Sequence, residues 1–428
     1  MESFKHRLNN LFENHGELIK LRQLIEEQKR NAWLVGGCLR DLLLCRPIFD
    51  VDVAVEGDPT ELAQQWAQLC SGRWFWLDRD RLQSRVLLPN QLTVDFTPLR
   101  ASTIRGDQCL RDFTINSFAL PFNGELACQT ILDPLHGLQD LEQCTLKFCS
   151  SRSIADDPLR MLKGVRHAVS LQMNLSDEAI QQIQDEASAI QAVAGERIHD
   201  ELGRILQSET PVLGLEKLHK CGLLYELFGK PSASWNADHS FHELREFNSR
   251  IVDYSEEESD EPTLGNSFST RALFMLATFI RHYQPDNLPA LLHEKLRLSR
   301  PHQRIVQCLQ QAPDKQWFKL VEQVETPRQK ALLVELLGHF PAEQMIYWSI
   351  SLQILQKGKV HDLLEAYHQN QCLGKVPDLL DGHQIEDILQ QFGKEIGQWQ
   401  KRIKQEELSG GIHSPEDAII WLKSKISD

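Results

Sequence analysis

The segment FDVDVAV, at residues 49–55, constrains the possible folds of this chain more than any other feature. Its apolar and β-branched residues predict a strand, and the alternation of a strand places Asp50 and Asp52 on the same face. Two carboxylates on one face repel each other, and their charge becomes costly if that face is buried. We therefore expect either an edge strand with a solvated face or a cation bound between the two acids.

The composition is that of an ordinary soluble protein. The chain has 428 residues, enough for two to four domains, with 41% hydrophobic and 25% charged residues. No apolar run approaches the roughly 20 residues of a membrane span, and the charged N-terminus is unlike a secretory signal, so no membrane association is expected. Ten cysteines without a CxxC pair favour reduced thiols and a cytoplasmic location.

The net charge of −14 bears on nucleic-acid binding. An acidic chain as a whole is repelled by phosphate backbones. Any RNA site must therefore be a local basic patch, which the composition does not reveal.

Strand and helix patterns alternate in the first 135 residues. We expect a polar amphipathic helix within residues 1–30 and a capped helix that opens at Asp58-Pro59-Thr60. The expected strands are residues 32–37, 49–55, 73–78, 84–89 and 92–99. Helical periodicity dominates from Ala155 to the end. The predicted architecture is an α+β head followed by a long all-α remainder.

The segment LVGGCLRDLLL places Gly36 and Gly37 between an expected strand and an expected helix. Glycines at such a turn let the backbone approach a ligand closely, and the helix that follows offers free N–H groups to phosphate. Arg40 would add a charge-assisted contact to phosphate oxygens. Taken alone, the segment is explained more simply by a glycine turn with Arg40 and Asp41 at the surface.

Asp50 and Asp52 offer the oxygen ligands that hard divalent cations prefer. Asp95 lies in another apolar strand pattern, LTVDFTPLR, and would add a third carboxylate. In two-metal phosphoryl transfer, ions about 3.5–4 Å apart stabilise the attacking and the leaving oxygens. A lone Asp-x-Asp is explained by an exposed strand face, but a glycine turn followed by three strand carboxylates indicates phosphoryl transfer.

Five motifs resemble, in order, those of the tRNA nucleotidyltransferase/poly(A) polymerase family, the bacterial-eukaryotic class of CCA-adding enzymes. They are LVGGCLRDLLLCRPIFDVDVAV, LRDFTINSFAL (110–120), LDPLHGLQDL (132–141), ADDPLRMLKGVRHA (155–168) and ERIHDELGRIL (196–206). The C-terminal segment that begins LLDGHQIEDI is also similar to the family's tail, whereas residues 211–350 match only loosely.

The resemblance implies a fold and an order of domains. The head is expected to be a nucleotidyltransferase domain with a polymerase-β-like mixed sheet, followed by an all-α neck, body and tail. We assign residues 1–135 to the head, 136–210 to a nucleotide-selecting neck, 211–350 to the body and 351–428 to a tRNA-binding tail.

The resemblance also implies an activity, the template-independent addition of nucleotides from CTP, and in some members ATP, to the 3′ end of tRNA. Two Mg²⁺ ions are expected on Asp50, Asp52 and Asp95, with Asp95 as third ligand or as base. The triphosphate would lie against Gly36, Gly37 and Arg40, and the ribose against Arg111, Asp112 and Asn116. No stable protein partner is expected.

The fourth motif carries Asp157 and Arg160, which we expect to lie three positions apart on one helix and therefore to share a face. The carboxylate can accept a hydrogen bond from the exocyclic amine of C or A, and the guanidinium can donate to the neighbouring ring atom. U and G present a carbonyl instead of that amine, so they leave buried polar groups unpaired. The competing interpretation makes Asp157-Pro158 a helix N-cap, with Asp156 as the alternative cap.

Two further cations, Lys163 and Arg166, continue the Arg160 face at helical spacing. They would contact the triphosphate or the RNA backbone if that face lines the site. The alternative is a solvated basic stripe, and the sequence favours neither interpretation.

The sequence departs from the family pattern at Leu110, Asp156 and Lys163, where the family usually has Arg, Glu and Arg. A more informative departure is the span ASTIRGDQCL between Arg100 and Arg111, because members that add the terminal A carry a longer flexible loop there. A short connection supplies no lever that could switch the selecting pair from C to A. We therefore expect addition of CMP only, with full CCA addition and poly(A) synthesis as alternatives.

Two other functional classes stay open. A non-catalytic RNA-binding protein could have inherited this fold, although the intact Asp50 and Arg160 argue against it. A phosphohydrolase of the His-Asp type would need metal ligands around a His-Asp pair. His199 belongs to the fifth motif, however, and no convincing set of ligands surrounds His361-Asp362.

Overall fold

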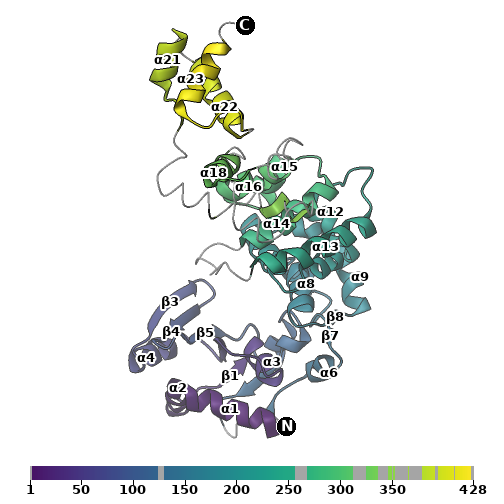
Figure 1. Cartoon of the computed structure of the whole chain (residues 1–428). Coiled ribbons are helices and arrows are strands. Elements are labelled where there is room, and N and C mark those ends of the chain that lie inside the picture. Colours follow the sequence, from purple (N-terminus) through teal and green to yellow (C-terminus); the bar gives the residue numbers. More distant parts are fainter. Residues whose placement is uncertain are drawn as a thin grey trace. The chain divides into compact units, whose positions relative to one another are not determined.

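The computed structural model describes residues 2–123, 130–255, 268–311, 324–335, 346–348, 350–351, 365, 378–390, 394–408 and 410–425. The chain forms two compact units, Met1–Gly229 and Lys230–Asp428. Figure 1 labels helices and strands of both units. Within the described ranges, no helix is long and apolar enough to cross a membrane. The division into head, neck, body and tail is finer than these two units and stays a prediction.

The first unit is built on a six-stranded mixed sheet with the strand order β3-β4-β5-β2-β1-β6. β2 and β5 run parallel, and the other neighbouring strands are antiparallel. The bounds are β1 Ala32–Val35, β2 Asp50–Val55, β3 Arg73–Asp78, β4 Gln83–Leu87, β5 Thr93–Pro98 and β6 Ala119–Pro121. The α+β class is confirmed, and β6 is a strand that the sequence patterns did not predict.

β2 lies in the interior of this sheet, between β1 and β5. The edge-strand explanation for its two acids is therefore wrong. Val53 points to the opposite face, where it is buried beside its β5 partner Phe96. Helix α4 (Thr60–Leu69) covers that face, and its Trp66 ring lies 5.6 Å from the ring of Phe96. One face of the sheet is a packed core, and the other face presents the acids.

The N-terminal segment forms two helices, α1 (Glu2–Asn14) and α2 (Gly16–Glu27), so the prediction of one helix within residues 1–30 is wrong. His15 leaves the helical region at φ −125° and ψ 74°. Its carbonyl accepts a hydrogen bond from Leu18 N at 2.8 Å, which starts the second helix. The break lets Leu18 and Leu21 of α2 be buried independently of α1.

The rest of the first unit is mostly helical, and α8 packs against α10 and α11. The helices are α3 Gly37–Leu43, α5 Ile104–Cys109, α6 Gly137–Glu142, α7 Ser153–Asp156, α8 Arg160–Ser170, α9 Asp177–Glu186, α10 Gly195–Leu206, α11 Pro211–Lys220 and α12 Leu223–Phe228. Short elements between them are η1 Thr114–Asn116, β7 Thr145–Leu146, β8 Asn174–Leu175 and η3 Ala187–Ala192. A Cβ at Gly214 would lie 2.3 Å from Ile205 Cγ2, so glycine is what allows α11 to approach α10.

The regular elements described in the second unit are all helices. Its helices are α13 Ala237–Ser255, α14 Thr270–Tyr283, α15 Leu288–Ala290, η4 Leu291–Lys295, α16 Arg300–Leu309, α18 Pro327–Glu335, α21 Gly382–Leu389, α22 Lys394–Leu408 and α23 Pro415–Ser424. Helices α21, α22 and α23 share an apolar core that includes Ile385, Ile403 and Leu422. Arg281 lies over the rings of Tyr347 and Trp348, at 5.8 and 5.1 Å from their centroids.

Candidate active site

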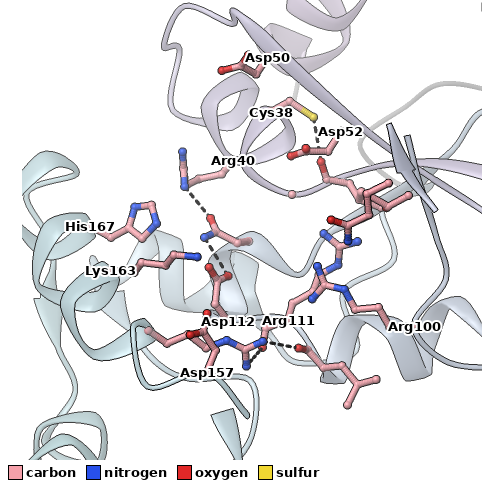
Figure 2. A pocket seen from close by; sticks show the side chains of 18 of the residues that line it. Cys38, Arg40, Asp50, Asp52, Arg100, Arg111, Asp112, Asp157, Lys163 and His167 are labelled. Carbon is pink, nitrogen blue, oxygen red and sulfur yellow. Dashed lines mark hydrogen bonds between the residues drawn. The ribbon is translucent and has the colours of Figure 1, made fainter. Parts of the chain in front are cut away.

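A cavity of about 1300 Å³ lies within the first unit and brings together distant parts of its sequence. Its lining includes the end of β1, the start of α3, the first half of β2, the α7–α8 connection and Arg197 of α10. Figure 2 shows Asp50 and Asp52 on the sheet side and Lys163, His167 and Asp157 on the helical side. Asp157, Arg160 and Lys163 of the fourth motif therefore face the same space as the residues predicted from the first motif.

Asp50 and Asp52 lie on the face of β2 that is turned away from α4, and they line this cavity. Asp52 sits directly opposite Asp95 in the parallel pairing of β2 with β5. Burial raises the pKa of Asp52 to about 6, with further contributions from Asp95 and Asp50, and Arg111 opposes the rise. Its negative charge is therefore only partly compensated by protein groups, which is the condition that favours a bound cation.

Asp95 makes a two-pronged ion pair with Arg85 of the neighbouring strand β4. Arg85 Nε and Nη2 donate to its two carboxylate oxygens at 2.6 and 2.8 Å. Asp95 does not line the cavity. In the part of the chain that the structure describes, no group of three or more His, Cys, Asp or Glu residues could hold a metal ion. The role of Asp95 as third ligand or base stays a prediction, and no sequence pattern indicated its ion pair with Arg85.

Gly36 lies where the backbone passes closest to Asp52. It precedes α3 with φ +77°, a left-handed conformation that favours glycine. A Cβ at this position would lie 2.6 Å from Asp52 Oδ2. Conformation and proximity both require glycine, so the turn is matched to the carboxylate beside it.

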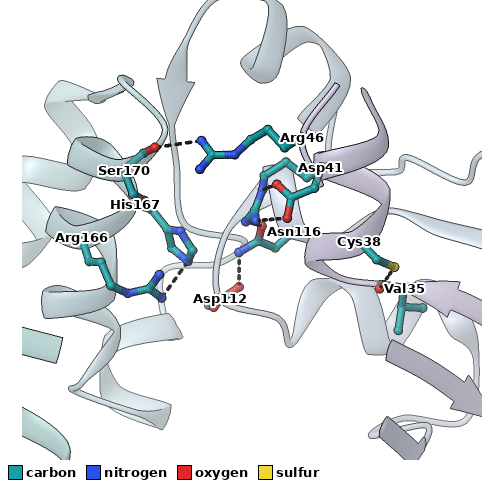
Figure 3. Close-up of polar contacts among 10 residues, drawn as sticks. Val35, Cys38, Asp41, Arg46, Asp112, Asn116, Arg166, His167 and Ser170 are labelled. Carbon is teal, nitrogen blue, oxygen red and sulfur yellow. Dashed lines mark hydrogen bonds and ion pairs between the residues drawn. The ribbon is translucent and has the colours of Figure 1, made fainter. Parts of the chain in front are cut away.

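Arg40, which follows the glycine turn, is hydrogen-bonded to the second motif, LRDFTINSFAL (Figures 2 and 3). Its Nε and Nη2 donate to Asp41 at 3.0 and 2.9 Å, and its Nη1 donates to Asn116 Oδ1 at 2.6 Å. Asn116 Nδ2 then donates to Asp112 Oδ1 at 3.3 Å. Arg40 and Asn116 are buried. Arg40, Asn116 and Asp112 thus form one hydrogen-bonded chain.

The short span between Arg100 and Arg111 is folded rather than extended. Thr103 caps α5 by accepting from Gly106 N at 3.1 Å. The buried Asp107 accepts from Arg100 N at 3.0 Å and from Arg111 Nε at 2.9 Å, so it fixes both ends of the span. The span therefore holds Arg111 in place through a buried carboxylate.

Asp157 does not share a helix with Arg160, so that prediction is wrong. Asp157 ends α7 in an extended conformation, with φ −154° and ψ 100°, and α8 begins at Arg160. Pro158 explains the break, because a residue before proline is disfavoured in the helical region. The N-cap assigned to α8 is Leu159, without a side-chain hydrogen bond, although the Asp157 carboxylate accepts a hydrogen bond from the N–H of Leu159.

The Asp157 carboxylate is held from two sides. Oδ1 accepts from Leu159 N at 3.3 Å, and Oδ2 accepts from Arg197 Nη2 at 2.9 Å. Burial opposes ionisation, but the hydrogen bond and charge of Arg197 hold the pKa of Asp157 below its usual value. Asp157 is therefore oriented as an acceptor at the cavity wall.

Arg160 is positioned by three backbone carbonyls. Its Nη1 donates to the carbonyls of Arg111 and Ser153 at 3.3 and 3.2 Å, and its Nη2 donates to the carbonyl of Leu110 at 3.0 Å. The side chain is buried at the cavity wall. These contacts tie Arg160 to the same span that carries Arg111.

Lys163 and Arg166 diverge. Lys163 lines the cavity, whereas Arg166 does not. Arg166 Nε donates to Glu201 of α10 at 2.6 Å, and Arg166 Nη2 lies 3.2 Å from His167 Nε2. Burial, together with the charges of Arg166 and Arg40, lowers the pKa of His167 well below its usual value. His167 was not predicted, because a lone histidine inside a helical pattern gives no signal.

Two domain models match the chain. The poly A polymerase head domain matches residues 32–147, and the probable RNA and SrmB-binding site of polymerase A matches residues 172–235. The head-domain match bears out, over these residues, the resemblance to the tRNA nucleotidyltransferase/poly(A) polymerase family. The resemblance drawn from the five motifs is confirmed.

Individual members of the family are also similar. A CC-adding tRNA nucleotidyltransferase of Geobacter sulfurreducens is 39% identical over 199 residues, which are 46% of this chain and 45% of the relative. A CC-adding tRNA nucleotidyltransferase of Synechocystis is 32% identical over 205 residues, 47% of this chain and 48% of the relative. The chain spans about half the length of these curated relatives.

Solved structures of the family match over more of the chain. A CCA-adding enzyme in complex with ATP aligns with a TM-score of 0.74 at 20% identity, over 100% of this chain and 98% of that one. A CCA-adding enzyme with CTP aligns with a TM-score of 0.70 at 21% identity, over 96% of each chain. At this identity the match establishes the fold, with its α+β head and helical remainder.

Further residues at the family site escaped the sequence patterns. Arg197 follows Glu196 in the fifth motif, but nothing in the sequence indicates that it reaches Asp157. Arg100 lies beside Arg111 and Arg160, and burial together with these two charges lowers the pKa of its guanidinium. His361-Asp362, the His-Asp pair considered for a phosphohydrolase, lies outside the described residues.

Proposed function

We propose that this chain adds CMP from CTP to the 3′ end of tRNA by phosphoryl transfer, without a nucleic-acid template. One observation carries the proposal: Asp50 and Asp52 line the same cavity as Asp157 and Arg160. The first pair suits a metal-assisted reaction on phosphate, and the second suits selection of a base with an exocyclic amine. A cytoplasmic location, expected from the cysteines, suits an RNA substrate.

The residues present fit a hard divalent cation. Asp52 is half-buried next to two other carboxylates, and this environment raises its pKa to about 6, so a cation at this position would relieve an unfavourable charge. We propose that Asp50 and Asp52 hold two Mg²⁺ ions, with Asp95 as third ligand or as base. Asp95 accepts two hydrogen bonds from Arg85, so this role requires Arg85 to give way. Bound Mg²⁺ would supply Lewis-acid stabilisation of negative charge on the phosphates.

The protein groups would bind and orient the two reactants. Gly36 and Gly37 leave room for a triphosphate close to Asp52, and Arg40 adds positive charge on the same side. Arg111, Asp112 and Asn116 would hold the ribose. The 3′ oxygen of the RNA then attacks the α-phosphate in line, and pyrophosphate leaves.

Base selection would rest on Asp157 and Arg160. The Asp157 carboxylate would accept from the exocyclic amine of cytosine, and Arg160 would donate to the ring nitrogen or carbonyl beside it. Both side chains are held by other protein groups before any nucleotide binds. Such preorganisation favours discrimination, because the wrong base leaves buried polar groups unpaired.

Addition of CMP alone is the preferred form of the proposal. Asp107 fixes both ends of the span between Arg100 and Arg111, and Arg160 is bound to carbonyls of that span. Arg160 of the selecting pair is thus tied to a short connection that is anchored by the buried Asp107, and this arrangement favours one base. Relatives named CC-adding support this form, but relatives named CCA-adding and A-adding are similar too. Full CCA addition is the second candidate and poly(A) synthesis the third.

A product ladder tests the proposal. A tRNA transcript that lacks its last three nucleotides is incubated with labelled CTP, with ATP and with both. Two added C residues and no A are expected, and Asp50→Ala should abolish addition. A product ending in A would show full CCA addition, and a long A tail would show a polymerase. Metal-dependent CTP binding without any product would favour the non-catalytic RNA-binding alternative.

A further inference from the structure

Phe49 is the most exposed large hydrophobic side chain in the part of the chain that the structure describes, at 73%. It lines the cavity and directly precedes Asp50. An aromatic ring in a cavity lined by carboxylates and guanidinium groups gains nothing from its own fold, because it stays in contact with water. Its position indicates that a flat, apolar surface of a ligand covers it.

The backbone that carries Phe49 is anchored both before this residue and at the residue itself. Before it, Arg46 Nη1 donates to the carbonyl of Ser170, at the end of α8, at 2.8 Å (Figure 3). At Phe49 itself, the carbonyl accepts from Thr93 N of β5 at 3.2 Å. Both anchors are backbone-directed, so they fix the segment without covering the ring. A ring presented in this way is preorganised for stacking.

The two carboxylates of β2 differ in their surroundings, and this difference indicates which reactant Phe49 meets. Asp52 is the inner one, against Gly36 and the glycine turn. Asp50 is the outer one and is exposed, and Thr93 Oγ1 donates to it. If the nucleotide lies on the inner side, between the turn and Asp157, the RNA end approaches from the side of Asp50 and Phe49.

We propose that Phe49 is a stacking platform for the base of the 3′-terminal nucleotide of the RNA. This inference rests on the proposed function. Every base has a π-face, so a single phenyl ring can support the end of the RNA whether its last base is the original one or a newly added C. Phe49 is therefore a positioning residue that places the attacking 3′ oxygen beside Asp50. It makes no contribution to the choice of the incoming nucleotide.

Three variants isolate this role in the full-length protein. Phe49→Ala removes the ring, and Phe49→Trp keeps an aromatic surface. Phe75→Ala makes the same change at another exposed ring, which lies on edge strand β3 and does not line the cavity. Both rings are exposed, so none of these changes should affect the melting temperature strongly.

Steady-state kinetics on truncated tRNA then give the result. Phe49→Ala should raise the KM for tRNA about tenfold, in line with the stacking energy of one base, while binding of CTP measured without RNA stays unchanged. Phe49→Trp and Phe75→Ala should behave like wild type. An unchanged KM for tRNA in Phe49→Ala, or a loss of CTP binding instead, would overturn the proposal.

A modified RNA distinguishes stacking from a structural effect. Wild type should bind a tRNA whose 3′-terminal nucleotide lacks its base about tenfold more weakly than it binds intact tRNA. Phe49→Ala should bind the two RNAs with equal affinity, because the ring that would stack on the base is already absent. Additive losses would overturn the inference. These tRNA affinities are measured without nucleotide, so they do not depend on the proposed reaction. If wild type adds no CMP, the proposed function is contradicted, but the four tRNA affinities still test the role of Phe49.

Discussion

Arg197 Nη2 donates to Asp157 Oδ2 at 2.9 Å and so links α10 to the connection between α7 and α8. The two residues are 40 positions apart in the sequence. Asp157 is the carboxylate proposed to read the amine of the incoming base, and Arg197 lines the same cavity. The orientation of the base-reading group therefore depends on a second helix.

Arg197→Met should loosen base selection. Without the guanidinium, Asp157 keeps the hydrogen bond from the N–H of Leu159 and the more distant charge of Lys163. We expect the KM for CTP to rise about tenfold and misincorporation of UMP to increase, because one charge-assisted hydrogen bond no longer orients the carboxylate. Single-nucleotide incorporation with CTP and UTP measures both effects.

Arg204→Met is the matched control for this prediction. Arg204 lies on the same helix, is exposed and does not line the cavity. Its replacement should leave CTP selection unchanged. If Arg197→Met also leaves selection unchanged, Asp157 is oriented by other means.

Gly36→Ala should be far more harmful to activity than to folding. The new Cβ would lie 2.6 Å from Asp52 Oδ2, and φ +77° disfavours any side chain. We expect stability to fall by about 1–2 kcal/mol from the backbone conformation, and CMP addition to fall by at least about a hundredfold because Asp52 is displaced. Urea denaturation and incorporation assays measure the two quantities.

Gly57→Ala separates strain from displacement. Gly57 has φ +78°, but a Cβ there would meet no atom within 4 Å. It should show the same loss of stability with nearly full activity. Equal losses of activity in the two variants would mean that displacement of Asp52 is not the cause.

The fold was predictable because its signals are local. Strand alternation and turn residues identify each strand that borders Asp50, Asp52 and Asp95. The residue before a proline is disfavoured in the helical region, so Pro158 also predicts the break at Asp157. The i, i+3 spacing from Asp157 to Arg160 had suggested a continuous helix instead. Local patterns thus account for most of the sheet, and for the break once the pre-proline rule is given its full weight.

The partners of the site residues were not predictable. The ion pair of Arg85 with Asp95 depends on the register of two antiparallel strands, and that register is set by turns and packing. Likewise, Arg166 and Lys163 have the same charge and helical spacing, yet one faces α10 and the other the cavity. Tertiary packing decides such cases, and a single sequence does not contain it explicitly.

Arg166→Met should reduce stability rather than RNA binding. Arg166 pairs with the buried Glu201 at 2.6 Å, so its removal leaves a buried carboxylate uncompensated, at a cost of about 3 kcal/mol. Combining Arg166→Met with Glu201→Met should recover most of this loss, because no unpaired charge then remains. Urea denaturation measures stability, and filter binding of tRNA measures the alternative. A weaker affinity for tRNA at normal stability would instead make Arg166 an RNA contact.

His167 should make stability depend on pH. Arg166 Nη2 lies 3.2 Å from Nε2, and a guanidinium can only donate, so the folded protein holds a neutral imidazole with its proton on Nδ1. Burial, aided by Arg166 and Arg40, lowers the pKa of His167 in the folded state. Below about pH 6.5, His167 therefore takes up a proton in the unfolded chain, whereas it stays neutral in the folded protein.

The contribution of neutral His167 to stability is therefore retained above the pKa of His167 in the unfolded chain, and it is lost as the pH falls below that pKa. We expect the free energy of unfolding to drop by up to about 1.4 kcal/mol per pH unit between about pH 6 and pH 5 on account of this group. His167→Gln should flatten that slope, whereas His6→Gln, at an exposed position of α1, should leave it as in wild type. Urea denaturation from pH 5 to pH 8 provides the measurement. If wild type and His167→Gln lose stability in parallel, the imidazole is not held neutral in the folded protein, and other groups set the acid limb.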